Sequence, residues 1–221
     1  PVDITENFEL DDFEVIIKAD FGEGFSVALT NFGRVFTWGD DSDGQLGDGE
    51  NDYTTIPVDI TDNFTLEVDD TIIDIEVGMY NSLAYTASGD LFAWGNNGYG
   101  QLGDGTEDDQ NLPVNIIDNV GLYYYETIEM MSLGSDHAMI VTSSGRLIAW
   151  GNNDEGQLAD DLTTMDYQPM DITLSLGLNA EELVVNAIAG EETSIALTSE
   201  GRVITWGYNE YGQMADGTFI S

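Results

Sequence analysis

The sequence predicts an all-β chain made of β-propeller blades, each with four antiparallel strands, in four repeats of 56 residues. Two observations carry this prediction. Tryptophan, glycine and glutamine recur at a constant interval with no insertions, and each interval contains short strand-like segments between turn residues. A unit of this size cannot bury its apolar face alone, so neighbouring units must stack. The recurring residues are Trp38, Trp94, Trp150 and Trp206, Gly33, Gly89, Gly145 and Gly201, and Gln45, Gln101, Gln157 and Gln213.

The second repeat shows the predicted strands most plainly. Apolar and polar residues alternate over 72–78, and 81–86 and 91–94 give the next two strands. The fourth strand, 112–116, contains a proline, which suits an edge strand that donates no ladder hydrogen bond. The second strand of every repeat is apolar on both faces, as expected for a sheet covered on both sides. Val27, Leu83, Met139 and Ile195 share one face, and Ala28, Ala84, Ile140 and Ala196 share the other.

Residues 1–221 are predicted to form one repeat array. The blades lie at approximately 14–60, 72–116, 128–172 and 184–221, and the last is incomplete. Residues 1–5 match 57–61 and are predicted to be an orphan outer strand. That strand can close the ring within its own chain or complete the last blade of another copy. We favour exchange between copies, or a longer parent protein, and assign the exchange to Pro1, Val2, Asp3, Ile4 and Thr5.

The charge of the chain limits its partners. It has 43 acidic and 4 basic residues, for a net charge of -39. Such a polyanion repels nucleic acid and anionic membrane surfaces, and it attracts basic proteins and divalent cations. No apolar run is long enough for membrane insertion. No cofactor is predicted beyond nonspecific divalent cations. Solubility or salt adaptation is the favoured explanation of the charge, because acidic residues occur throughout every repeat instead of forming a patch.

The recurrent motif supports a family resemblance. Residues 33–49 contain the string Gly-Arg-Val-Phe-Thr-Trp-Gly, then a few variable residues, then Gly-Gln-Leu-Gly-Asp-Gly. Related strings start at Gly89, Gly145 and Gly201. This pattern resembles the regulator of chromosome condensation repeat family. Within that family, the chain resembles microbial members more than the nuclear exchange factor. The resemblance implies a propeller, usually of seven blades. It transfers no functional residue, although His137 stands where the family keeps a structural histidine.

Tyrosines are the main candidates for a binding surface. Tyr123, Tyr124 and Tyr125 replace the mostly acidic residues of the other repeats. They can anchor a partner, because tyrosine is enriched at interface hot spots, or they can pack beneath a neighbouring blade. Tyr99, Tyr208 and Tyr211 follow the Trp-Gly step and form a second candidate.

Two possible chemical sites also have structural explanations. Asp41, Asp43 and Glu50 fall on places of an EF-hand-like calcium pattern, but Gly39 occupies its first place. Catalysis by a nucleophile triad would need His137, the only histidine, and a packing or hydrogen-bonding role is favoured there. Paired carboxylates are too frequent to indicate glycosidase chemistry.

The sequence therefore predicts a non-catalytic protein-binding or assembly module on a rigid acidic propeller. Its partner is a protein, basic proteins included, or another copy of the chain. The alternative is a structural subunit that self-assembles by strand exchange, and a distant one is a carboxylate-based hydrolase. We expect an extracellular or cell-surface location. We also expect the chain to be a homo-oligomer or a fragment of a longer repeat protein.

The charge predicts a salt-dependent stability. Repulsion across a surface with a net charge of -39 is screened within about 10 Å at 0.1 M salt. The melting temperature, followed by circular dichroism, should rise substantially from low to molar NaCl, with a further gain from calcium. A melting temperature that stays flat over that range would exclude salt adaptation.

Overall fold

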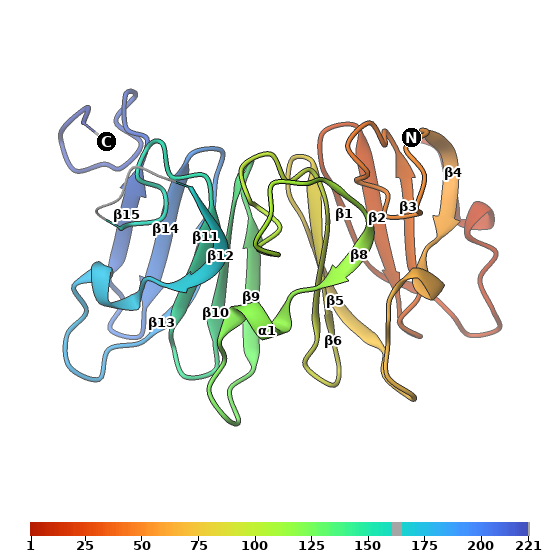
Figure 1. The fold of residues 1–221 in the computed structure, drawn as a ribbon, viewed down its shortest axis with the longest axis horizontal. Helices are drawn as coiled ribbons and strands as arrows, with labels where there is room; N and C mark the ends of the chain where they lie inside the picture. The colour runs from red at the N-terminus through yellow and green to blue at the C-terminus, as the bar shows by residue number, and fades with distance from the viewer. Residues whose placement is uncertain (161–164, 221) are drawn as a thin grey trace. The chain divides into compact units, whose positions relative to one another are not determined.

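The computed structural model describes residues 1–160 and 165–220 and consists mainly of antiparallel β-sheet (Figure 1). The predicted all-β fold class is confirmed by four sheets, three with four strands and one with three. The predicted blades 128–172 and 184–221 include 161–164 and 221, which lie outside the described residues. Within the described ranges, no helix is long and apolar enough to cross a membrane.

Each sheet is an antiparallel meander in which consecutive strands are neighbours. The first contains β1 (Ile16–Phe21), β2 (Phe25–Thr30), β3 (Val35–Gly39) and β4 (Thr54–Asp59). The second contains β5 (Ile72–Val77), β6 (Asn81–Thr86), β7 (Leu91–Gly95) and β8 (Gln110–Asn115). The third contains β9 (Ile128–Leu133), β10 (His137–Thr142), β11 (Leu147–Gly151) and β12 (Asp166–Asp171). The fourth contains β13 (Val184–Ala189), β14 (Thr193–Thr198) and β15 (Val203–Gly207).

Short helical turns were not predicted. After β4, β8 and β12 the chain forms η2 (Thr61–Asn63), α1 (Ile117–Val120) and η3 (Thr173–Leu176), and a similar turn, η1, spans Thr5–Phe8. Each places an apolar residue in or beside a core, as Phe8 does with an exposed fraction of 5%.

The outer strand predicted for residues 1–5 is absent from the structure. Residues 1–4 have no regular structure and Thr5 begins η1. Asp3 favours this turn, since its Oδ1 accepts hydrogen bonds from the Thr5 backbone N at 3.0 Å and from Thr5 Oγ1 at 2.7 Å. A strand needs a partner strand, so exchange with another copy remains a prediction.

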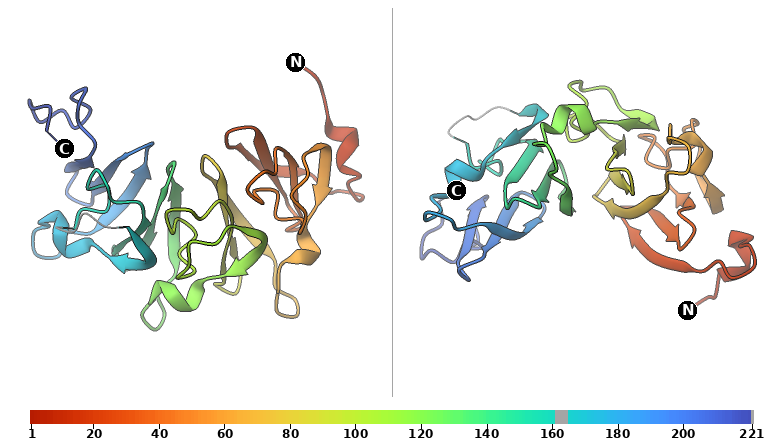
Figure 2. Two further views of the ribbon diagram at one scale, coloured as in Figure 1. Left: turned by 45° about the horizontal axis from the view of Figure 1, so that its top comes forward. Right: turned by 90° about the horizontal axis from the view of Figure 1, so that it is seen from below.

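The described chain divides into two compact units. The first holds residues 1–96 and 108–117, and the second holds 97–107 and 118–221. In each unit two sheets lie face to face (Figure 2). The shared core of the first unit contains Val27, Leu29, Val35, Ile75, Ala84, Phe92 and Trp94, and that of the second contains Met139, Val141, Leu147, Ala187, Ala196 and Trp206.

Buried tryptophans connect the second, third and fourth sheets to the loop of the repeat before each of them. Trp94 Nε1 donates to the backbone oxygen of Gln45 at 3.0 Å. The same bond joins Trp150 to the Gln101 oxygen at 2.8 Å, and Trp206 to the Gln157 oxygen at 2.7 Å. These carbonyls have no water to bond in the core, so the indole N–H satisfies them.

The tryptophan contact explains one of the repeated glycines. Gly103 has φ +74°, and a Cβ there would lie 2.8 Å from Trp150 Nε1. Ala159 stands at the equivalent place of the next repeat and still adopts the left-handed conformation, with φ 54°. The repeat therefore keeps the left-handed backbone conformation at this position even where a Cβ raises its free energy.

Replacing Trp150 by phenylalanine tests the role of this bond. The change removes the indole donor of the buried Gln101 oxygen and opens a small cavity, so it should lower the free energy of unfolding by about 2–3 kcal/mol. Trp38→Phe is the matched control, because Trp38 is only half-buried. Urea unfolding measures both. Equal losses for the two variants would show that the buried bond contributes nothing specific.

Candidate functional site

The first candidate surface is the loop between α1 and β9 that carries three consecutive tyrosines, at the lower edge of Figure 1. A tight turn builds it: the Glu126 backbone N donates to the Tyr123 oxygen at 2.9 Å, and the Tyr123 backbone N donates to Glu126 Oε2 at 2.8 Å. Tyr124 and Tyr125 are 86% and 87% exposed, so they are available for contact rather than packed beneath a blade.

The base of this loop is a buried ion pair. Glu126 has a side chain only 2% exposed, and its Oε2 lies 2.7 Å from Arg146 Nη1. Arg146 also pairs with Asp171 at 2.8 Å, and its guanidinium lies 4.1 Å from the ring centre of Tyr123. Burial opposes ionisation of Glu126, but hydrogen bonds from Ser144, Thr142 and the Tyr123 backbone and the Arg146 charge outweigh it and lower the pKa of Glu126.

The second candidate is a hollow of about 390 Å³ between the β13–β14 turn and the loop after β15. It is lined by Glu191, Glu192, Thr193, Tyr208, Tyr211 and Gln213. The two tyrosine rings meet edge to face with centres 6.1 Å apart, and Tyr208 donates to Glu210 at 2.8 Å. The structure thus brings predicted Tyr208 and Tyr211 together, whereas Tyr99 is 40% exposed and does not line this hollow.

Acidic side chains concentrate charge around this hollow. Burial, followed by repulsion from Glu155, Glu191 and Asp136, raises the pKa of Glu192. Carboxylates that repel one another in this way attract a cation. Aromatic ring faces attract the same groups. The lining chemistry is therefore suited to a basic side chain.

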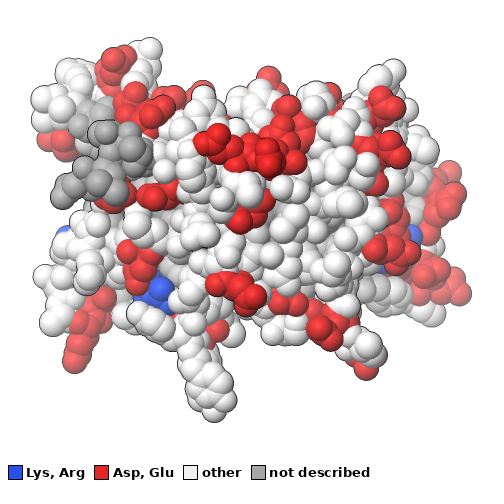
Figure 3. All heavy atoms as spheres, in the orientation of Figure 1, with Lys and Arg blue, Asp and Glu red and all other residues white. Residues whose placement is uncertain are grey.

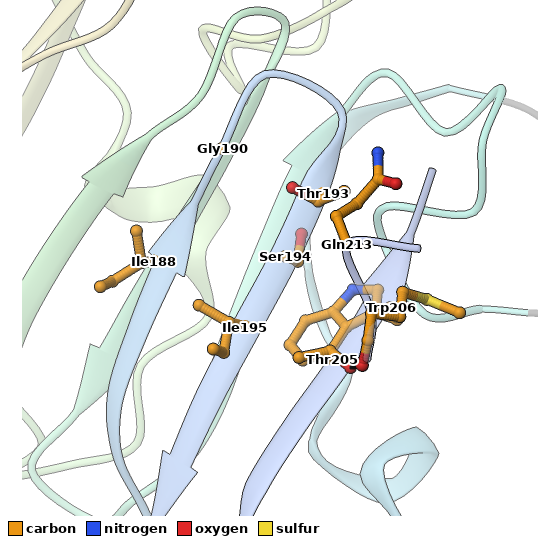
Figure 4. Close-up of a pocket in the computed structure, with 9 residues that line it drawn as sticks. Ile188, Gly190, Thr193, Ser194, Ile195, Thr205, Trp206 and Gln213 are labelled. Carbon is orange, nitrogen blue, oxygen red and sulfur yellow. Dashed lines mark hydrogen bonds between the residues drawn. The ribbon is translucent and has the colours of Figure 1, made fainter. Parts of the chain in front are cut away.

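An apolar hollow of about 210 Å³ adjoins the first and shares Thr193 and Gln213 with it (Figure 4). Figure 4 shows Ile188 on β13, Ile195 on β14 and Thr205 on β15 around it. Ile188 and Ile195 are 53% and 37% exposed. Together the two hollows offer an acidic aromatic surface beside an apolar one.

His137 has the structural role that the sequence favoured. It is 1% exposed, its Nε2 lies 2.9 Å from Ser194 Oγ, and burial lowers the pKa of His137 to about 4. Ser194 is also buried, and its hydroxyl donates to the Gln157 backbone oxygen at 2.9 Å. This histidine–serine contact joins two strands in the core, where no substrate can reach it.

The calcium candidates do not form the EF-hand arrangement. Asp41 is buried, and its Oδ1 accepts the Leu46 backbone N at 2.8 Å, which shapes the loop from inside. Glu50 is exposed, and Asp43 is half-buried. Over residues 1–160 and 165–220, no group of three or more acidic, histidine or cysteine side chains is placed to hold a metal ion.

The surface agrees with the acidic composition. Acidic atoms are spread over the face shown in Figure 3, and basic atoms are few. The four basic residues are largely engaged: Lys18 pairs with Asp74 and Glu76, and Arg34, Arg146 and Arg202 each pair with a buried glutamate. The free charge of the molecule is therefore almost wholly negative.

Fold and repeat together define a β-propeller protein, and the sequence comparisons give its family. The chain matches the regulator of chromosome condensation (RCC1) repeat, at residues 33–85 and 88–141 for one family model. A second model of the same repeat matches 16–45, 72–101, 131–157 and 189–213. The chain belongs to the RCC1 repeat family.

Known proteins of this family are similar over most of the chain. "Probable E3 ubiquitin-protein ligase HERC6" of Homo sapiens is 34% identical over 87% of the chain and 18% of its own length. "Ultraviolet-B receptor UVR8" of Arabidopsis thaliana is 29% identical over 89% of the chain, which spans 42% of that receptor.

Solved structures give the same fold. Human WBSCR16 has a TM-score of 0.76 and 26% identity over 93% of the chain and 51% of its own. Prp20p of Saccharomyces cerevisiae has a TM-score of 0.74 and 24% identity, and the match covers 93% of this chain and 48% of Prp20p. The chain thus spans about half the length of these two structures. Such propellers are scaffolds typical of protein-binding or regulatory modules.

The buried Glu126 predicts a pH dependence. Its pKa is lowered in the folded chain, so its contribution to stability is present above the unfolded value of 4.5 and is lost as pH falls through the folded pKa. Glu126→Gln should cost about 1–3 kcal/mol in the free energy of unfolding at pH 7. Urea unfolding between pH 7 and pH 3 should show the variant losing less stability than the wild type. Parallel losses would contradict this role.

Proposed function

We propose that this chain is a non-catalytic protein-binding module that accepts a basic side chain of its partner between Tyr208, Tyr211, Glu191 and Glu192. The acidic aromatic hollow is the observation that carries the proposal. The hollow of about 390 Å³ is large enough to admit a lysine or arginine head group, and its two tyrosine rings and two carboxylates suit the charge of that group.

The neighbouring apolar hollow defines the rest of the partner segment. Because it shares Thr193 and Gln213 with the acidic one, an apolar residue next to the basic residue can enter it. Ile188 and Ile195 would bury apolar surface on contact. The proposed ligand is a short protein segment that alternates basic and apolar residues. The net charge of -39 would speed its approach.

The relatives support a protein ligand at a general level. The structure of Prp20p was described together with its binding to Gsp1p and histones, and histones are basic proteins. That binding belongs to Prp20p, whose 24% identity with this chain establishes a common fold alone. A basic protein partner is consistent with it. An extracellular or cell-surface location also remains part of the proposal.

The tyrosine loop is a second contact of the same module. Tyr123, Tyr124 and Tyr125 project from a turn held by a buried ion pair, so they reach a partner without a large loss of loop entropy on binding. The turn persists in other repeats with different side chains: the Glu182 backbone N donates to Asn179 at 3.1 Å in the same way.

Self-association is the second candidate function. Leu197 and Val203 are 39% and 62% exposed on the fourth sheet, which is the last sheet of the chain, whereas their counterparts Val141 and Leu147 are buried against that sheet. An apolar face of this kind can pair with another copy. Such pairing would use a sheet face rather than the strand exchange predicted from residues 1–5, which remains a separate prediction.

Peptide binding tests the proposal. The probe is a labelled ten-residue peptide of alternating lysine and leucine. The control peptide has glutamine in place of each lysine and therefore lacks the positive charge. Fluorescence anisotropy at 0.15 M NaCl should give binding of the lysine peptide, weakened about 10-fold or more by Tyr208→Ala with Tyr211→Ala. Replacing Tyr123, Tyr124 and Tyr125 by serine should leave the fold intact and weaken binding less.

The controls separate this site from general charge attraction. Tyr53→Ala removes a tyrosine that is 76% exposed and far from the hollow in sequence, and it should leave affinity unchanged. Equal affinities for wild type and the double variant would overturn the proposal. Sedimentation of the free chain over a range of dilutions serves as a further control, since a complex that dissociates on dilution would favour self-association.

A further inference from the structure

The loop after the third strand of each repeat is fastened by one buried polar side chain, and the first repeat differs from the others at this residue. The later repeats have Asn97, Asn153 and Asn209 there, and the first has Asp41. All four are 0% exposed. The residue seven places further along is aspartate in every repeat: Asp48, Asp104, Asp160 and Asp216.

The asparagine uses both ends of its amide. In the second repeat, Asn97 Oδ1 accepts the Leu102 backbone N at 3.0 Å. Its Nδ2 donates to Asp104 Oδ1 at 3.1 Å and to the Thr106 backbone oxygen at 3.0 Å. Asn209 repeats this pattern with Asp216 and Thr218 at 3.4 Å each. The amide hydrogens therefore sit between acceptor oxygens.

The first repeat has the same frame without those hydrogens. Asp41 Oδ1 accepts the Leu46 backbone N at 2.8 Å, as the asparagine oxygen does. Asp48 Oδ1 accepts the Glu50 backbone N at 2.8 Å, as Asp104 Oδ1 accepts that of Thr106. Asp41 Oδ2 is buried and has no hydrogen-bond partner. By its place in the repeat this oxygen corresponds to the amide nitrogen of Asn97, whose acceptors correspond to Asp48 and to the Glu50 backbone oxygen. The Glu50 oxygen also accepts a hydrogen bond from Asn111 Nδ2 at 3.4 Å.

A buried carboxylate oxygen with no hydrogen-bond partner is strongly unfavourable. Asp48, Asp40 and Asp52 add further negative charge near Asp41. A positive group in the position that the amide hydrogens hold in the other repeats would satisfy this oxygen. Neither lysine nor arginine pairs with Asp41 among the described residues.

We propose that Asp41 Oδ2, the Asp48 carboxylate and the Glu50 backbone oxygen bind a divalent cation, with Ca²⁺ as the preferred ion. Calcium accepts a mixture of carboxylate, carbonyl and water oxygens in irregular geometry, whereas magnesium requires a near-ideal octahedron. Asp48 is half-buried and Glu50 exposed, so water can complete the coordination from the open side. This site differs from the EF-hand pattern, since it uses Asp48 and a backbone oxygen instead of Asp43 and the Glu50 side chain.

The test compares the wild type with Asp41→Asn, which restores the side chain of the other repeats. Both are stripped with chelator and melted at pH 7.5 in 0.5 M KCl, which screens the general surface charge. Without calcium, Asp41→Asn should melt at a higher temperature than the wild type, because its amide remakes the two hydrogen bonds. At a calcium concentration ten times the dissociation constant, the melting temperature of the wild type should rise by about 3 °C or more relative to the variant.

Asp43→Asn is the matched control, because it removes the same charge from the same loop without removing a proposed ligand. It should keep the calcium response and the affinity measured by calorimetry. Equal calcium responses in the wild type and Asp41→Asn would overturn the proposal, as would an equal loss in Asp43→Asn. A wild type that gains stability on acidification to pH 5 but not with calcium at pH 7.5 would also overturn it, by showing that a proton alone occupies the position. The peptide-binding proposal is independent of this outcome.

Discussion

Three buried hydrogen bonds from tryptophan indoles to backbone oxygens hold this structure together. Trp94, Trp150 and Trp206 each donate to the carbonyl of the repeated glutamine in the loop of the preceding repeat. A sheet in this chain is therefore completed by a loop that belongs to another repeat, and neither part is satisfied alone. The constant interval of the repeat suits this geometry, because an insertion between loop and indole would move the indole N–H away from its carbonyl.

The same constraint separates scaffold from function. The buried asparagine or aspartate fastens the inner half of the loop in all four repeats, and the indole bond adds to it in the first three, so its shape persists from repeat to repeat. The outer half differs in sequence from repeat to repeat. Tyr208 and Tyr211 project from one loop of this kind, and Asp41 changes the fastening of another. Binding sites on repeat proteins need this arrangement, in which a fixed inner part of the loop holds variable outer residues in place.

The local sequence pattern predicted the strands well. It could not predict contacts between residues that are distant in the sequence. The range 81–86 was predicted as a strand and is β6, because alternation and turn glycines report directly on a sheet. The outer strand predicted at 112–116 begins earlier, at Gln110, which pairs with Gly95 beyond a register shift. The helical turns are too short for a helical period. Glu191 and Glu192 were not singled out among 43 acidic residues, since only the fold sets them beside Tyr208 and Tyr211. A comparison of Asp41 with its asparagine counterparts was the one signal in the sequence for the proposed cation site.

Hydrogen exchange of the four indole N–H groups, followed by NMR, tests the central role of the tryptophan bonds most directly. The indole protons of Trp94, Trp150 and Trp206 should exchange slowly, close to the rate set by global unfolding, because their partners are buried backbone oxygens. That of the half-buried Trp38 should exchange much faster. Fast exchange at all four indoles would contradict the account, since the loops would then open without unfolding the sheets they complete.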